Sequence, residues 1–143
     1  MKNLLENNRC VNGDKRKIVV VQEHKRKYVG RNSQDKLLHI CIVDNCLITT
    51  GCRCDYLLLN LQEKRAYFIE LKGRDLVHAI EQIDTTISHY LKDLTGFRIN
   101  ARVVLTKVNT PDLLSTQFIK LERRLKKHNG SFLKSVNLLE EQL

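Results

Sequence analysis

The order of apolar and polar positions along the chain predicts a series of strands followed by alternating helices and strands. Gly30 to Ser33 has the composition of a turn, and the polar sequence Gln62-Glu63-Lys64 between two apolar segments is typical of a β-hairpin. Four apolar segments before residue 73 have the length and composition of strands. They are residues 18–22, 37–43, 52–61 and 65–72.

The spacing of apolar residues changes after Gly73. Leucine, isoleucine and alanine then recur at steps of three and four residues, which predicts an amphipathic helix over 75–94 that ends before Gly96. A buried strand is predicted over 97–107, and Thr110-Pro111-Asp112 is expected to open a second helix that runs to His128. A last strand over 131–138 and an acidic tail complete the prediction.

These elements predict one α/β domain with a mixed central sheet flanked by helices. A length of 143 residues suits a single domain, and 42% hydrophobic residues provide enough apolar surface for a core. Residues 1–14 are rich in asparagine and are expected to form a flexible or helical N-terminal arm, so the domain proper spans 15–143. No apolar run approaches the length of a membrane span, so a membrane partner is not expected.

The cysteines indicate the cellular compartment. Their number, five, is odd, and residues 1–30 lack the apolar region of a secretory signal. We therefore expect reduced thiols in a cytoplasmic protein. Their spacing matches no zinc-binding pattern.

The net charge of +9, from 25 basic and 16 acidic residues, favours a polyanionic partner. Nucleic acid is the natural choice, although charged runs also occur on simple solvated faces. The basic residues expected to contact it are Lys15, Arg16, Lys17, Lys25, Arg26, Lys27, Arg74, Lys120, Arg123, Arg124, Lys126 and Lys127.

Three charged residues interrupt the apolar strands of the predicted hairpin: Asp55, Glu70 and Lys72. Burying a charge is costly unless it is paired or binds a metal. Side chains alternate along a strand, so Glu70 and Lys72 lie on the same face. If the turn is centred between Gln62 and Glu63, Asp55 lies directly opposite Glu70, and two carboxylates so close repel each other unless a cation lies between them.

A divalent cation would resolve that repulsion. Mg²⁺, or Mn²⁺ in its place, would be bound by Asp55, Glu70 and a backbone carbonyl, for which Leu71 is the candidate. Lys72 would then orient or deprotonate an attacking water. The alternative is an ion pair between Asp55 and Lys72, with Glu70 at an exposed edge of the sheet.

The pattern Asp55…Glu70-Leu71-Lys72, followed by Gly73 and an amphipathic helix, resembles the PD-(D/E)XK nuclease superfamily. This superfamily includes restriction endonucleases, Holliday junction resolvases and RecB-type exonuclease domains. The resemblance covers about residues 41–107 and implies a restriction endonuclease-like αβββαβ core. It implies that Asp55 and Glu70 bind metal and that Lys72 is catalytic. Cys54 stands where many members have proline.

The resemblance also implies two further site residues. Many members carry another acid before the sheet, for which we favour Asp44 or Glu23. RecB-type members carry a glutamine in a Q-x3-Y motif on the helix after the E-x-K sequence. Gln82 matches it, although Thr86 replaces the tyrosine. We expect Gln82 to line the site and His78 to be a weaker candidate, the alternative for Gln82 being a solvent-facing position.

The sequence thus predicts a metal-dependent endonuclease that hydrolyses phosphodiester bonds of DNA, including branched or structured DNA, with DNA favoured over RNA. Cutting two strands would need two sites, which favours a homodimer or larger assembly. Two alternatives remain open. One is a non-catalytic nucleic-acid-binding or assembly protein with a nuclease-like fold, and the other is a defence effector that cleaves RNA.

Overall fold

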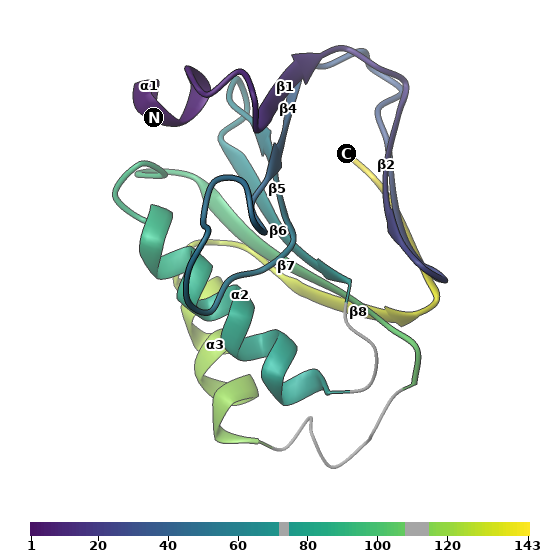
Figure 1. The fold of residues 1–143 in the computed structure, drawn as a ribbon, viewed down its shortest axis with the longest axis vertical. Coiled ribbons are helices and arrows are strands. Elements are labelled where there is room, and N and C mark those ends of the chain that lie inside the picture. The colour runs from purple at the N-terminus through teal and green to yellow at the C-terminus, as the bar shows by residue number, and fades with distance from the viewer. Residues whose placement is uncertain (72–74, 108–114) are drawn as a thin grey trace.

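A six-stranded sheet forms the centre of the molecule, with two helices on one face and a smaller three-stranded sheet on the other (Figure 1). The computed structural model describes residues 1–71, 75–107 and 115–143. The elements, in chain order, are α1 (Lys2–Leu5), β1 (Val11–Asp14), β2 (Ile18–Glu23), β3 (Arg26–Arg31), β4 (Leu38–Ile42), β5 (Tyr56–Asn60), β6 (Arg65–Leu71), α2 (Leu76–Tyr90), β7 (Arg98–Leu105), α3 (Thr116–Lys127), β8 (Phe132–Val136) and β9 (Leu138–Gln142).

The six-stranded sheet is mixed, in the order β1-β4-β5-β6-β7-β8. The pairs from β1 to β6 are antiparallel, and those from β6 to β8 are parallel. The direction changes at β6 because parallel neighbours need a long crossover connection, which α2 and α3 supply. The predicted hairpin is confirmed as β5 and β6, and the predicted α/β class is confirmed with it.

The two long helices begin at side-chain caps. The Asp75 carboxylate accepts a hydrogen bond from the His78 N–H at 2.9 Å, and the Ser115 hydroxyl accepts one from the Phe118 N–H at 3.1 Å. The first helix ends near Tyr90, earlier than predicted, because residues 91–96 form turns. The predicted opening of the second helix at residues 110–112 lies outside the described residues.

The three-stranded sheet, β2-β3-β9, differs most from the sequence prediction. The turn expected at Gly30–Ser33 is wrong at Gly30 and Arg31, which both lie in β3. A Cβ atom at Gly30 would come within 2.6 Å of the Leu143 side chain, so glycine permits the close approach of residue 143. The expected acidic tail is also wrong, because Leu138–Gln142 forms β9 and pairs in parallel with β3.

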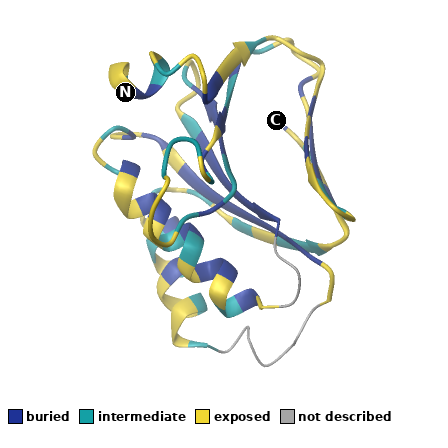
Figure 2. Cartoon of the chain, viewed as in Figure 1, coloured by how far each residue is buried: buried dark blue, intermediate teal, exposed yellow. Residues whose placement is uncertain are grey.

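Alternation along the strands divides the core into two layers. One lies between the six-stranded sheet and the helices and includes Leu57, Leu59 and Phe68. The other lies between the two sheets and includes Leu58 and Tyr67. Figure 2 shows buried segments along the central sheet and on the sides of the helices that face it.

The cysteine prediction needs one correction. Cys10 and Cys46 form a disulfide, so the expectation of reduced thiols is wrong for these two residues. Val11–Asp14 adds β1 to the edge of the sheet, where the Ile42 N–H donates to the Cys10 carbonyl at 2.8 Å, and this brings residue 10 beside the loop after β4. Cys41 and Cys54 are buried free thiols, and Cys52 is exposed.

None of the described helices is long and apolar enough to cross a membrane.

Candidate functional site

The pairing of β5 with β6 confirms the predicted register. Tyr56 lies opposite Ile69, and Leu57 lies opposite Phe68. The same register places Asp55, one position before β5, opposite Glu70 near the end of β6. The two acids therefore meet where one strand begins and its neighbour ends.

Both acids lie on the helix-facing side of the sheet. Leu57 and Phe68, two positions from Asp55 and Glu70 respectively, belong to the core layer under the helices. Glu70 is only 2% exposed, and its strand is flanked by β5 and β7. The alternative that put Glu70 at an exposed sheet edge is therefore wrong.

The backbone on both sides holds Asp55 in place. Its carboxylate accepts a hydrogen bond from the Leu71 N–H at 2.8 Å. Its carbonyl accepts from the N–H groups of Val43 and Asp44 at 3.0 and 3.3 Å. The position of Asp55 is thus fixed by the end of β6 and by the loop after β4.

Burial raises the pKa of Asp55 above its ordinary value, while the bond from the Leu71 N–H and a hydrogen bond with the Glu70 side chain act in the opposite direction. The opposed positions of the two acids on neighbouring strands bring their side chains to the same place on the sheet.

The two candidates for an additional acid both lie within electrostatic reach of this pair. The charges of Glu23 and Asp44 each raise the pKa of Asp55. Glu23 ends β2 and is exposed. Asp44 accepts a hydrogen bond from Arg53 Nε at 2.7 Å, so its charge is partly neutralised. The described residues include no group of three or more His, Cys, Asp or Glu arranged to hold a metal ion.

Gln82 lies beside a pocket of about 400 Å³ between α2 and the loop before β5, which Asp44, Arg53 and His78 also line. Its amide donates to the Arg53 carbonyl at 3.0 Å. Its oxygen is buried and has no hydrogen-bond donor among the described residues. Gln82 as a whole is half-buried, so it faces the pocket while one of its polar atoms is covered. His78 is more exposed and lies 4.0 Å from Glu81.

Thr86, which takes the place of the expected tyrosine, connects this pocket to the strand that carries Asp55. Its hydroxyl accepts from the Cys54 N–H at 2.8 Å and donates to the Gln82 carbonyl at 2.7 Å. This role was not predicted from the sequence. A threonine within the apolar stripe of α2 could have indicated a buried side-chain hydrogen bond.

Arg26 makes a contact that the sequence analysis also missed. Its Nε donates to the Leu71 carbonyl at 3.0 Å, the oxygen predicted to bind metal. This contact brings the 25–27 basic cluster to the end of β6, beside the two acids. Lys72 and Arg74 lie outside the described residues.

The predicted basic residues divide into two groups. Arg16, Lys17, Arg124 and Lys126 form ion pairs with Asp14, Asp35, Asp84 and Glu122. The others in the described part of the chain make no ion pair with a described residue and remain available to an external anion. They are Lys15, Lys25, Arg26, Lys27, Lys120, Arg123 and Lys127.

Comparison with known proteins gives no further constraint: no family model, curated protein or solved structure matches the chain.

Proposed function

We propose that this protein is a metal-dependent nuclease of the PD-(D/E)XK type that hydrolyses phosphodiester bonds, with DNA as the favoured substrate. One observation carries the proposal. Asp55 and Glu70 lie opposite each other on one partly buried face of the sheet. Opposed carboxylates repel each other, and a divalent cation bound between them would relieve that repulsion.

The order of elements supports the same proposal. β4, β5 and β6 are consecutive antiparallel neighbours, and α2 then crosses over to β7, which pairs in parallel with β6. This order is compatible with the βββαβ part of the core that the resemblance implies. The helix expected before it has only a four-residue counterpart, α1, and the β2–β3 hairpin comes between α1 and β4.

The donor set fits Mg²⁺, which prefers oxygen ligands and keeps several waters. Asp55 and Glu70 would hold the ion. The Leu71 carbonyl already accepts from Arg26, but a carbonyl oxygen has a second lone pair to offer. When bound, the ion would supply Lewis-acid stabilisation of negative charge on the phosphate.

The other side chains of the site suit a phosphodiester substrate. Gln82, Arg53 and His78 line the neighbouring pocket and offer it polar groups. Lys25 and Lys27 flank Arg26, which contacts the end of β6, and are suited to the phosphates on either side of the cut. Lys72 is proposed to assist the attacking water, as the resemblance implies. Cutting both strands of a duplex would need a second copy of the chain.

The test uses labelled duplex, branched and single-stranded DNA, and RNA, each with Mg²⁺, Mn²⁺ or EDTA. We expect cleavage that requires the metal. Asp55→Asn and Glu70→Gln should each lower the rate by roughly 10²-fold or more, because each removes a charge that holds the metal. Glu122→Gln, which changes an acid of α3 in the same way, should keep the wild-type rate.

Three results would decide against the proposal or narrow it. Binding of nucleic acid without cleavage under any condition would favour the non-catalytic alternative. Cleavage of RNA alone would favour the defence effector. Cleavage that persists in EDTA or in both variants would contradict a role for the acid pair.

A further inference from the structure

Two arginines lie side by side at the start of two neighbouring strands, far from the acid pair. Arg65 begins β6 and Arg98 begins β7, and they are direct partners in the parallel register. Like charges at directly opposed positions in a sheet are destabilising. Both residues line a polar pocket of about 270 Å³, which Asn100, Arg102 and Ser131 also line.

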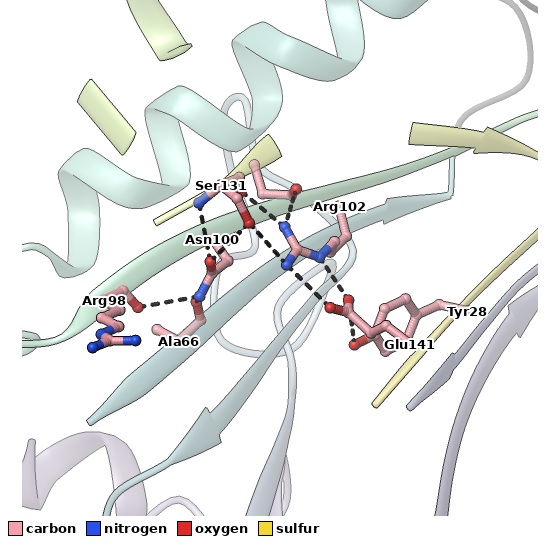
Figure 3. Close-up of polar contacts among 8 residues, drawn as sticks. Tyr28, Ala66, Arg98, Asn100, Arg102, Ser131 and Glu141 are labelled. Atoms are coloured by element: carbon pink, nitrogen blue, oxygen red, sulfur yellow. Dashed lines mark hydrogen bonds and ion pairs between the residues drawn. The ribbon is translucent and has the colours of Figure 1, made fainter. Parts of the chain in front are cut away.

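The pocket has an excess of positive charge. Glu141 is the single acid among its lining residues, and Arg102 already binds it, with Nε 2.6 Å from Oε2 and Nη2 3.1 Å from Oε1. Arg65 lies 3.6 Å from Glu63, whose carboxylate also binds Lys36 at 3.1 Å. Arg98 makes no ion pair within the described part of the chain, and Figure 3 shows its guanidinium apart from the hydrogen-bonded network.

The wall of the pocket is rigid without any ligand. Arg102 Nη1 donates to the carbonyls of Ala101 and Ser131 at 3.0 and 2.8 Å. The Asn100 amide donates to the Ala66 carbonyl at 3.2 Å, and its oxygen accepts from the Ser131 N–H at 3.1 Å (Figure 3). A Cβ atom at Gly130 would lie 1.7 Å from the Ile99 carbonyl oxygen, so the turn after α3 packs directly on β7.

We propose that this pocket binds a phosphate group, with the guanidinium groups of Arg65 and Arg98 as the principal donors. Paired guanidinium groups match phosphate oxygens in geometry and charge. The bound anion would remove the repulsion between the two arginines. The pocket is larger than one phosphate group, so it could also hold a sugar or a second phosphate attached to the first.

This site is separate from the proposed nuclease site. Arg65 and Glu70 lie near opposite ends of β6, about 17 Å apart by the rise of a strand. They also lie on opposite faces, because Arg65 shares a face with Tyr67, which packs between the two sheets. The proposal therefore does not depend on catalysis.

The test is calorimetric titration of the full chain, in low salt, with inorganic phosphate, pyrophosphate, and a short oligonucleotide with and without a 5′-phosphate. The comparison is between wild type, the Arg65→Gln/Arg98→Gln double variant, and Arg9→Gln as a control that removes an exposed charge from the turn before β1. We expect saturable binding of a phosphate ligand that weakens at least tenfold in the double variant and less than twofold in the control. In NMR spectra of the wild type, the backbone amide signals of Asn100, Gly130 and Ser131 should shift when the ligand is added.

The ligands also identify the source of the phosphate. Binding that requires the 5′-phosphate of the oligonucleotide would assign the site to a nucleic-acid end, whereas tighter binding of pyrophosphate would assign it to a free polyphosphate. Absence of saturable binding in all four titrations, or equal weakening in the double variant and the control, would overturn the proposal. Thermal unfolding of each variant separates lost binding from lost folding.

Discussion

The two faces of the central sheet bury charge in opposite ways. On the face between the sheets, Arg102 is 4% exposed and is fully engaged by Glu141, by backbone carbonyls and by the ring of Tyr67. On the helix face, Glu70 is 2% exposed and lies against another acid, Asp55. The first arrangement sets opposite charges against each other, and the second sets like charges against each other. The difference separates a structural ion pair from a proposed binding site.

The largest expected effect on stability comes from breaking the internal pair. Arg102→Met keeps the apolar stem but leaves Glu141, whose side chain is 14% exposed, without its main partner, and should lower the free energy of unfolding by about 3–5 kcal/mol. Urea denaturation measures it. Adding Glu141→Gln should recover part of the loss, because no charge then remains buried alone. A loss below about 1 kcal/mol in Arg102→Met would contradict a structural role for the pair.

A smaller effect is expected from the covalent link on the helix face. The Cys10–Cys46 disulfide spans 36 residues and anchors the loop whose N–H groups bind the Asp55 carbonyl. The Cys10→Ser/Cys46→Ser variant should lose about 2–4 kcal/mol of stability, since the unfolded chain gains freedom. Denaturation of this variant, and of wild type with dithiothreitol, measures the loss. Cys52→Ser, which removes a free thiol, is the control. If the double variant and the reduced wild type were as stable as the untreated wild type, the disulfide would contribute nothing to stability.

The smallest stability change is expected at Asp55. Because burial raises its pKa, the native state binds a proton more readily than the unfolded state, so stability falls as pH rises from about 3.8 through the raised value. Asp55→Asn removes this cost and should be slightly more stable than wild type at pH 7 without metal. Thermal unfolding between pH 4 and pH 8 measures the difference.

Two controls sharpen the Asp55 comparison. The advantage of Asp55→Asn should shrink as pH falls toward 4, because the wild-type carboxyl then becomes neutral. Added Mg²⁺ should stabilise wild type and leave the variant unchanged. A variant that is less stable than wild type at pH 7 without metal would indicate that Asp55 is a structural residue.

Local patterns were sufficient to predict one half of this molecule. The hairpin register and the opposition of Asp55 and Glu70 follow from the two-residue period of strands and the position of one turn. The first long helix follows from its apolar spacing in the same way. These features depend on residues that are neighbours in sequence.

The other half depends on pairing across the chain. Strand β3 was not predicted because it begins among the basic residues 25–27, and β9 was not predicted because it contains the acids Glu140 and Glu141. Both form strands because they pair with each other, and this pairing is not visible in the local sequence. The contact of Arg26 with Leu71 was missed for the same reason. Arg102 interrupts an apolar strand as Glu70 does, so its burial was predictable, although its partner was not. The disulfide could not be assigned from cysteine spacing alone.

The parallel pairing of β3 with β9 also has a consequence for synthesis on the ribosome. Tyr28 donates to Glu141, a residue 113 positions later. At about 5–20 residues per second, roughly 6–23 s pass between the emergence of these two residues. During that time the edge of β3 that will pair with β9 is open. The nascent chain therefore exposes an unpaired strand edge, a site for pairing with neighbouring chains, until β9 emerges.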